Sequence, residues 1–207
     1  KTRFSLFPHT NAAILRVSKK VCAEATPILY AGNDWAIPRP TCELSPPPDY
    51  SVRLFPRGCQ RLVTRLSIKI RSFYDLEWLL LGGGAGQLRN FYRGLVSLTL
   101  LVEVEAVGKG WSKVWARRGD EVWNLYVERL QGEIAAELFR KSKTKGKGKA
   151  KVGKVVPAWI NLRVLFGSER YVEGGDTVES QGVEQVVREE LRQGMVQAWE
   201  MFRKGAK

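Results

Sequence analysis

Three segments in which apolar and polar residues alternate constrain the fold of this chain most. They cover residues 62–71, 95–105 and 158–167, and the alternating apolar positions are Leu, Ile, Val or Phe. A period of two residues predicts a β-strand with one apolar and one polar face. Segments with the periodicity of amphipathic helices follow these strands, at residues 73–94, 121–141 and 181–204. The sequence therefore predicts a strand followed by a helix, three times over.

This order predicts an α/β fold in which parallel strands are joined by right-handed crossovers. A parallel sheet with helices on both faces has almost uniformly apolar strands. Because these strands are apolar on one face only, we expect two layers, with helices on one face and the other face open or only partly covered. The architecture would be an irregular relative of leucine-rich repeats, because the strand centres are 32 and 64 residues apart, whereas regular repeats span about 20–29 residues.

Residues 14–37 predict a further amphipathic helix that precedes a short strand. The apolar stripe of this helix is formed by Leu15, Ser18, Cys22, Ala25 and Leu29. Proline lacks an amide hydrogen, so Pro27 weakens the last turn, and Gly32 and Asn33 end the helix. We expect Cys22 to be a small buried hydrophobic residue.

A length of 207 residues with 44% hydrophobic residues suits a single domain over residues 1–207. Residues 38–58 contain six prolines, which predicts a long surface connection rather than part of a sheet or helix. Residues 141–156 are rich in lysine and glycine and hold no acidic residue. Their like charges repel and they have little to bury, so we expect a disordered insert.

The cysteines and the apolar runs bear on the cellular compartment. The three cysteines form no Cys-x-x-Cys pair, so we expect neither disulfides nor a zinc site, and an intracellular location, nuclear or cytoplasmic. No apolar run is long enough for a transmembrane helix or a signal peptide. The chain begins at Lys1 rather than methionine, so we expect it to be part of a longer protein.

The open face of the predicted sheet is the candidate binding surface, because tryptophan and arginine dominate the hot spots of protein interfaces. The residues that we expect to contact a partner protein are Arg65, Lys69, Arg71, Thr99, Leu101, Glu103, Trp159, Asn161 and Arg163. The alternative is that residues 1–56, or a segment outside this chain, cover this face.

The charge distribution suggests a second function. Of the net charge of +13, residues 1–72 contribute +8 and residues 138–156 contribute another +8. Basic side chains that neutralise phosphates release counterions, which favours nucleic-acid binding. The candidates are Arg57, Arg61, Lys141, Lys143, Lys145, Lys147, Lys149, Lys151 and Lys154, with Arg65, Lys69 and Arg71 beside them. The insert contains no aromatic residue for base stacking. A nuclear-import signal and a solvated loop remain as alternatives.

The sequence offers little for catalysis. His9 is the only histidine, which excludes most catalytic triads and histidine-rich metal sites. The glycine-rich residues 82–86 match neither a dinucleotide-binding motif nor a P-loop, and we expect a break between two helical segments there. We therefore expect no catalytic residues, no metal ligands and no cofactor, and a protein that is not an enzyme.

One stretch resembles a known family. Residues 15–33 follow the pattern LRVxxxxxxEAxPILYxxN and are similar to the signature of a large family of fungal F-box-like proteins. The family often has cysteine where Ser18 stands, and an aromatic residue after the asparagine that Trp35 matches approximately. Members usually carry an upstream F-box-like Leu-Pro-x-Glu helix, which this sequence lacks.

The resemblance implies a substrate receptor of a cullin-type ubiquitin ligase. A Skp-type adaptor would be a partner only if an F-box precedes residue 1. The sequence as a whole thus predicts a non-enzymatic module that binds a partner protein through the open sheet face. The alternative is a basic factor that binds nucleic acid or ribonucleoprotein, and no membrane contact is expected.

Overall fold

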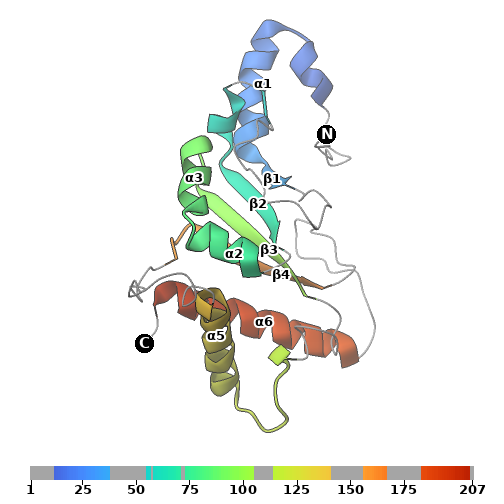
Figure 1. The fold of residues 1–207 in the computed structure, drawn as a ribbon. Coiled ribbons are helices and arrows are strands. Elements are labelled where there is room, and N and C mark those ends of the chain that lie inside the picture. The colour runs from blue at the N-terminus through green and yellow to red at the C-terminus, as the bar shows by residue number, and fades with distance from the viewer. Residues whose placement is uncertain are drawn as a thin grey trace.

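The computed structural model describes residues 12–37, 55–56, 58–70, 73–104, 114–140, 156–166 and 183–205. They form an α/β fold around one sheet of four parallel strands, which follow one another in chain order (Figure 1). The strands are β1 (Asp34–Ile37), β2 (Arg65–Ile70), β3 (Ser97–Val104) and β4 (Ile160–Phe166). The helices are α1 (Lys19–Gly32), α2 (Phe73–Leu80), α3 (Gly84–Phe91), α5 (Trp123–Arg140) and α6 (Val183–Lys204), with 3₁₀ turns η1 (Ala12–Arg16) and η2 (Cys59–Leu62). The predicted two-layer α/β fold with parallel strands is confirmed.

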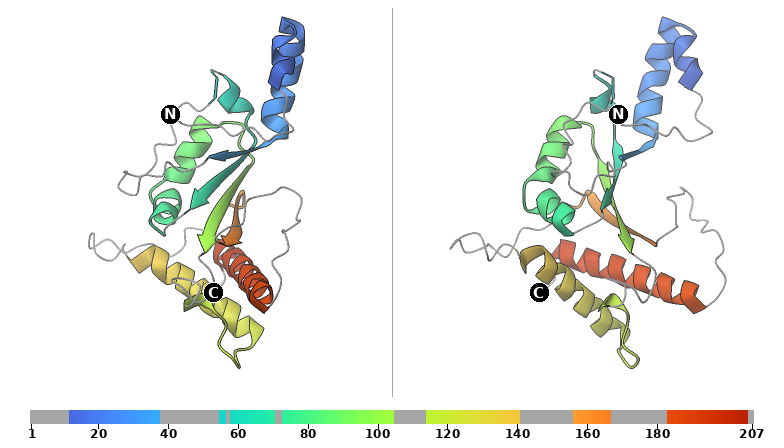
Figure 2. Two further views of the ribbon diagram at one scale, coloured as in Figure 1. Left: turned by 90° about the vertical axis from the view of Figure 1, so that its right-hand side faces the viewer. Right: turned by 45° about the vertical axis from the view of Figure 1, so that its right-hand side comes forward.

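The sheet has one apolar and one polar face, as the alternation predicts. The strand register places Leu66, Leu98 and Ile160 in one row across the sheet, and all three are buried. Helices α2 and α3 cover this apolar face, while α5 packs on α2 and α6 (Figures 1 and 2). Each strand therefore contributes alternate side chains to a single core, and the intervening side chains form the polar face.

Helix α6 lies along the outer edge of β4 (Figure 1). Arg192 Nε donates a hydrogen bond to the carbonyl oxygen of Val164 at 3.4 Å. An Arg203 guanidinium nitrogen donates to the carbonyl oxygen of Ala158, just before the strand, at 3.0 Å. An exposed strand edge invites pairing with other chains, and α6 caps this edge with side-chain donors.

The glycine-rich residues between α2 and α3 form the predicted helix break. Gly83 adopts a φ of 82°, in the left-handed region that glycine tolerates. The chain turns there, so that α2 and α3 are two short helices on the same face rather than one long helix.

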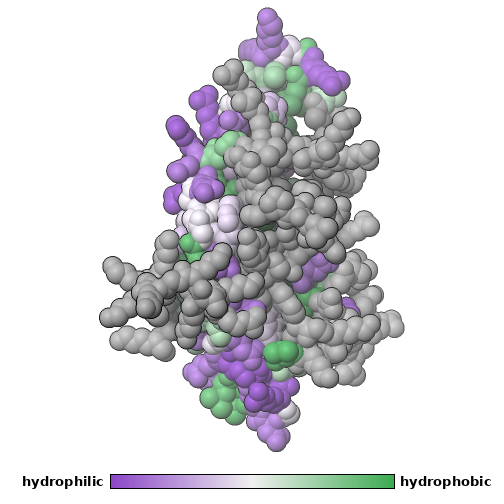
Figure 3. All heavy atoms as spheres, in the orientation of Figure 1, coloured by the Kyte–Doolittle hydropathy of each residue, from purple (hydrophilic) through white to green (hydrophobic). Residues whose placement is uncertain are grey.

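The first helix differs from the prediction. Ser18 is not part of an apolar stripe, because its Oγ accepts a hydrogen bond from the Val21 amide at 3.1 Å and caps the amino end of α1. Helix α1 projects from the body (Figure 1), and of its residues only Tyr30 is buried. Cys22, expected to be buried, is half-buried, and Ile28 is 73% exposed. Figure 3 shows apolar green surface between hydrophilic purple side chains at this end.

The carboxyl end of α1 fastens it to the sheet. The rings of Tyr30 and Trp35 stack at 5.3 Å, and Trp35 Nε1 donates to the carbonyl oxygen of Tyr30. Thr64 Oγ1 donates to the carbonyl oxygen of Ala31 at 2.7 Å. Phe55 packs edge-on against Tyr30, Trp35 and Tyr92. An aromatic cluster thus joins α1 to the apolar face.

Several predictions concern residues outside the described ranges. They include residues 1–11, the proline-rich connection at 38–58 apart from 55–56 and 58, and the lysine insert at 141–156 apart from Val156.

Candidate functional site

Most of the side chains that we expect to contact a partner lie on the polar face of the sheet. The register places Lys69, Leu101 and Arg163 in one row across three strands, and Thr99 beside Asn161 in the preceding row. Seven of the nine candidates share this face: Arg65, Lys69, Thr99, Leu101, Glu103, Asn161 and Arg163. Helices α2 and α3 lie on the opposite side of the sheet (Figure 2).

Charged groups on the polar face are held by carboxylates on neighbouring strands. Lys69 Nζ lies 2.6 Å from Glu103 Oε2, and Arg65 Nε lies 3.7 Å from Asp34 Oδ1. Arg65 also donates through a terminal guanidinium nitrogen to the carbonyl oxygen of Gly32 at 2.5 Å. These contacts fix long side chains in defined positions, and they lower the net positive charge of the face.

A second polar chain joins the carboxyl-terminal helix to the sheet. Asn161 Nδ2 donates to Ser97 Oγ at 3.1 Å, and Asn161 Oδ1 accepts from an Arg203 guanidinium nitrogen at 3.3 Å. Arg203 comes from α6, about 40 residues further along the chain, so no spacing in the sequence pointed to it.

Exposure varies along the polar face. Ser67, Leu101 and Leu165 are buried, with 1%, 5% and 8% of their surface exposed. Arg65 and Asn161, which lie at the amino ends of their strands, are exposed. The accessible part of the polar face therefore lies toward the amino ends of the strands, and the expectation of a partly covered face fits this pattern.

Trp159 lies elsewhere than predicted. Strand β4 begins at Ile160, and Trp159 occupies the turn before it. The guanidinium of Arg89, on α3, lies 5.5 Å from the centre of the Trp159 ring. Strand alternation does not hold in a turn, so the ring lies beside the helix that covers the apolar face.

The basic residues proposed for nucleic-acid binding are only partly described. Arg61 is exposed in η2. The others, Arg57 and the lysines from Lys141 to Lys154, lie outside the described residues, as does Arg71. Within the described ranges, Lys69 and Arg65 of the basic strip are both engaged with carboxylates.

Two structural findings bear on chemistry and on membranes. In the described parts of the chain, no three His, Cys, Asp or Glu side chains come together in a way that could hold a metal ion. Among the helices of the described ranges, none has the length and apolar character that spanning a membrane requires.

Another charged cluster lies away from the polar face, between α5 and the residues before it. Arg129 donates to Glu121, to Glu133 and to the carbonyl oxygen of Ala116. The hydrogen bond from Arg129 holds the pKa of Glu121 at about 2, below its ordinary value of 4.5. The Arg129 guanidinium is bonded through Nε and both terminal nitrogens within the cluster, so it fastens the chain before α5 to the helix.

Comparison of the chain with protein-family models, with curated proteins and with solved structures finds no match.

Proposed function

We propose that this chain is a non-enzymatic interaction module that binds a partner protein through the polar face of its sheet. The observation that carries the proposal is the alignment of seven side chains on the face that α2 and α3 leave free. Cross-strand pairs such as Lys69 with Glu103 hold these side chains in place before binding. Groups ordered in advance lose less conformational entropy when a partner binds.

The composition of the polar face also supports a protein partner. It carries arginine, lysine, a carboxylate and an amide, whereas Leu101 among them is buried in the free chain. Polar and charged side chains of these kinds form the solvent-accessible rim of protein interfaces. The similarity of residues 15–33 to fungal F-box-like proteins adds a narrower proposal, a substrate receptor of a ubiquitin ligase.

Nucleic-acid binding is the alternative that the basic charge of the chain supports. The pairing of Arg65 and Lys69 with Asp34 and Glu103 weighs against it, because paired cations release fewer counterions on binding phosphate. Titration of duplex DNA and single-stranded RNA across a salt series tests it, with the intact chain beside one that lacks residues 141–154. Tight binding that falls steeply with salt and needs the insert would replace the protein-partner proposal.

The experiment that tests the main proposal compares two double variants. Arg65→Glu with Asn161→Arg alters the exposed part of the polar face. Lys204→Glu with Gln193→Arg makes the same kinds of change on the exposed side of α6. Circular dichroism first checks that both variants fold. Proteins that co-purify with the chain in its native cells are then quantified by mass spectrometry.

The proposal requires a protein that is lost from the polar-face variant and retained by the α6 variant. Direct titration of that purified protein should then show an affinity about tenfold lower for the polar-face variant. Equal recovery of every co-purified protein by both variants would contradict the proposal.

A further inference from the structure

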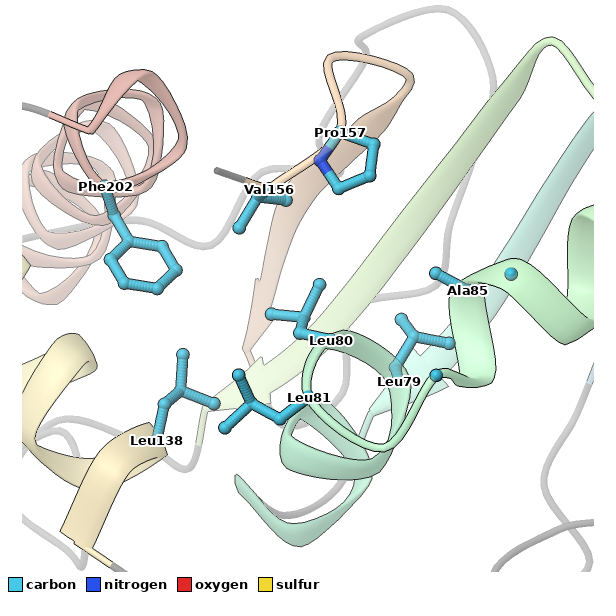
Figure 4. Close-up of a pocket in the computed structure, with 10 residues that line it drawn as sticks. Leu79, Leu80, Leu81, Ala85, Leu138, Val156, Pro157 and Phe202 are labelled. Atoms are coloured by element: carbon cyan, nitrogen blue, oxygen red, sulfur yellow. The ribbon is translucent and has the colours of Figure 1, made fainter. Parts of the chain in front are cut away.

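An apolar pocket of about 250 Å³ lies where the turn between α2 and α3 meets the ends of α5 and α6. Figure 4 shows Leu81 of the turn, Leu138 of α5, Phe202 of α6 and Val156, which precedes β4, around a common space. Among the described residues, every side chain that lines the pocket is apolar. The apolar lining of the pocket differs from the charged and polar side chains of the polar face. The proposed function makes no use of the pocket.

The residues that line the pocket differ in burial. Leu138 and Val156 are buried, whereas Leu81 and Phe202 are only half-buried. Exposed apolar walls of this kind gain free energy when an apolar group displaces water from them. Pockets for drug-sized ligands measure about 300–1,000 Å³. A space below that range suits one flexible aliphatic chain better than a fused ring system.

One end of the pocket is the amino end of α3. Gly83, Ala85 and Gly86 line it, and no side chain caps this helix. Amide hydrogens in the first turn of a helix have no partner within the helix. Together with the helix dipole they favour a negatively charged group. The pocket therefore combines apolar walls with an end that suits an anion.

We propose that this pocket binds a free medium-chain fatty acid. The aliphatic chain lies against Leu81, Leu138 and Phe202, and the carboxylate lies at the amino end of α3. This assignment is independent of the polar face, so either proposal can fail alone.

Calorimetric titration of the full chain with sodium decanoate, below its aggregation concentration, tests the assignment. The alkanoates from hexanoate to dodecanoate should bind about fourfold more tightly for each added methylene until the chain fills the pocket. Decanol, which lacks the charge, should bind several-fold more weakly than decanoate. Saturation without dependence on chain length, or decanol binding as tightly as decanoate, would overturn the proposal.

Two variants locate the site, each with a matched control. Gly86→Glu places a carboxylate in the first turn of α3, where no neighbouring atom lies within 4 Å of a new Cβ. An acidic residue there suits the helix dipole, so α3 should remain folded while decanoate affinity falls about tenfold. Gly119→Glu, also at a position with open space, carries the same charge in a distant loop and should bind normally.

Leu81→Gln should weaken decanoate binding through loss of apolar contact, and Leu125→Gln, at an exposed position on α5, should leave it unchanged. Decanoate binding that both Gly86→Glu and Leu81→Gln leave intact would place the ligand elsewhere and overturn the assignment. A further experiment with lipid vesicles distinguishes binding of a free fatty acid from binding of a membrane lipid. Co-sedimentation with phosphatidylglycerol vesicles by a chain that does not bind decanoate would also contradict it.

Discussion

Arg129 donates two hydrogen bonds to the carboxylate of Glu121, from Nε to Oε1 at 2.7 Å and from a terminal nitrogen to Oε2 at 2.8 Å. The two side chains are only 16% and 11% exposed. The same guanidinium donates to the carbonyl oxygen of Ala116 at 3.0 Å. Glu121 in turn accepts from the amide of Arg118. This bidentate pair fastens the chain before α5 to the helix, and it makes the stability of that region dependent on pH.

We expect Glu121→Gln to lower the thermal midpoint at neutral pH. The hydrogen bond from Arg129 depresses the pKa of Glu121 from 4.5 to about 2. A depressed folded-state pKa contributes stability above pH 4.5, and this contribution is lost as the pH falls toward 2. The difference between wild type and variant, followed by thermal melts, should therefore shrink across that window. Glu128→Gln, at an exposed position on α5, serves as control, and a difference that stays constant down to pH 2 would contradict the prediction.

For Tyr92 we expect the stability of the fold to fall as the pH rises into the alkaline range. Burial raises the pKa of its phenol to about 12 from an ordinary value of 10.0. The stability that the neutral phenol contributes is fully present below pH 10 and lost as the pH rises toward 12. Denaturant melts across this range should show the loss, and it should be smaller in Tyr92→Phe.

Tyr92→Phe should also be neutral or stabilising by up to about 1 kcal/mol at pH 7, because an unpaired buried hydroxyl costs free energy. The Tyr92 hydroxyl is buried without a hydrogen-bond partner within the described residues. A clear destabilisation at neutral pH would mean that the hydroxyl is bonded in solution.

Gly94 allows a close approach between two segments of backbone. A Cβ at this position would lie 2.2 Å from the carbonyl oxygen of Arg61 and 3.2 Å from that of Val63. Backbone cannot rotate away as a flexible side chain can, so Gly94→Ala should destabilise the fold by at least about 1–3 kcal/mol. Gly119→Ala, where nothing lies within 4 Å, is the control. Urea unfolding of both variants measures the difference, and equal midpoints would refute the close approach.

The sheet was predictable from the sequence because alternation is a local property. Leu98, Leu100 and Val102 lie two residues apart, so they share a face whatever else the chain does. A helix that connects two neighbouring strands of one sheet returns the chain to the same end of the sheet, so the strands run parallel. These two facts were enough for the layers, the strand direction and seven of the nine candidate residues.

What packs on a face was not predictable in the same way. Periodicity indicated that Leu15 and Leu29 share a side of a helix, but nothing local says that α1 should project from the body with only Tyr30 buried. Ser18 was assigned to the apolar stripe, although serine before a helix is also a typical cap. Trp159 was misplaced because the strand begins at Ile160, two residues later than the alternation suggested.

The coupling energy between Lys69 and Glu103 can distinguish a structural role of the polar face from a role in binding. The two side chains are 33% and 28% exposed, so their coupling in the free chain should be modest, about 0.2–1 kcal/mol. A double-mutant cycle with Lys69→Met and Glu103→Gln, read out by urea unfolding, measures this coupling. If the polar face binds a partner, the same cycle read out by binding affinity should give a larger coupling. The partner removes water from the pair, and desolvated charges interact more strongly. A coupling that is equal in both measurements would assign the pair to the fold alone.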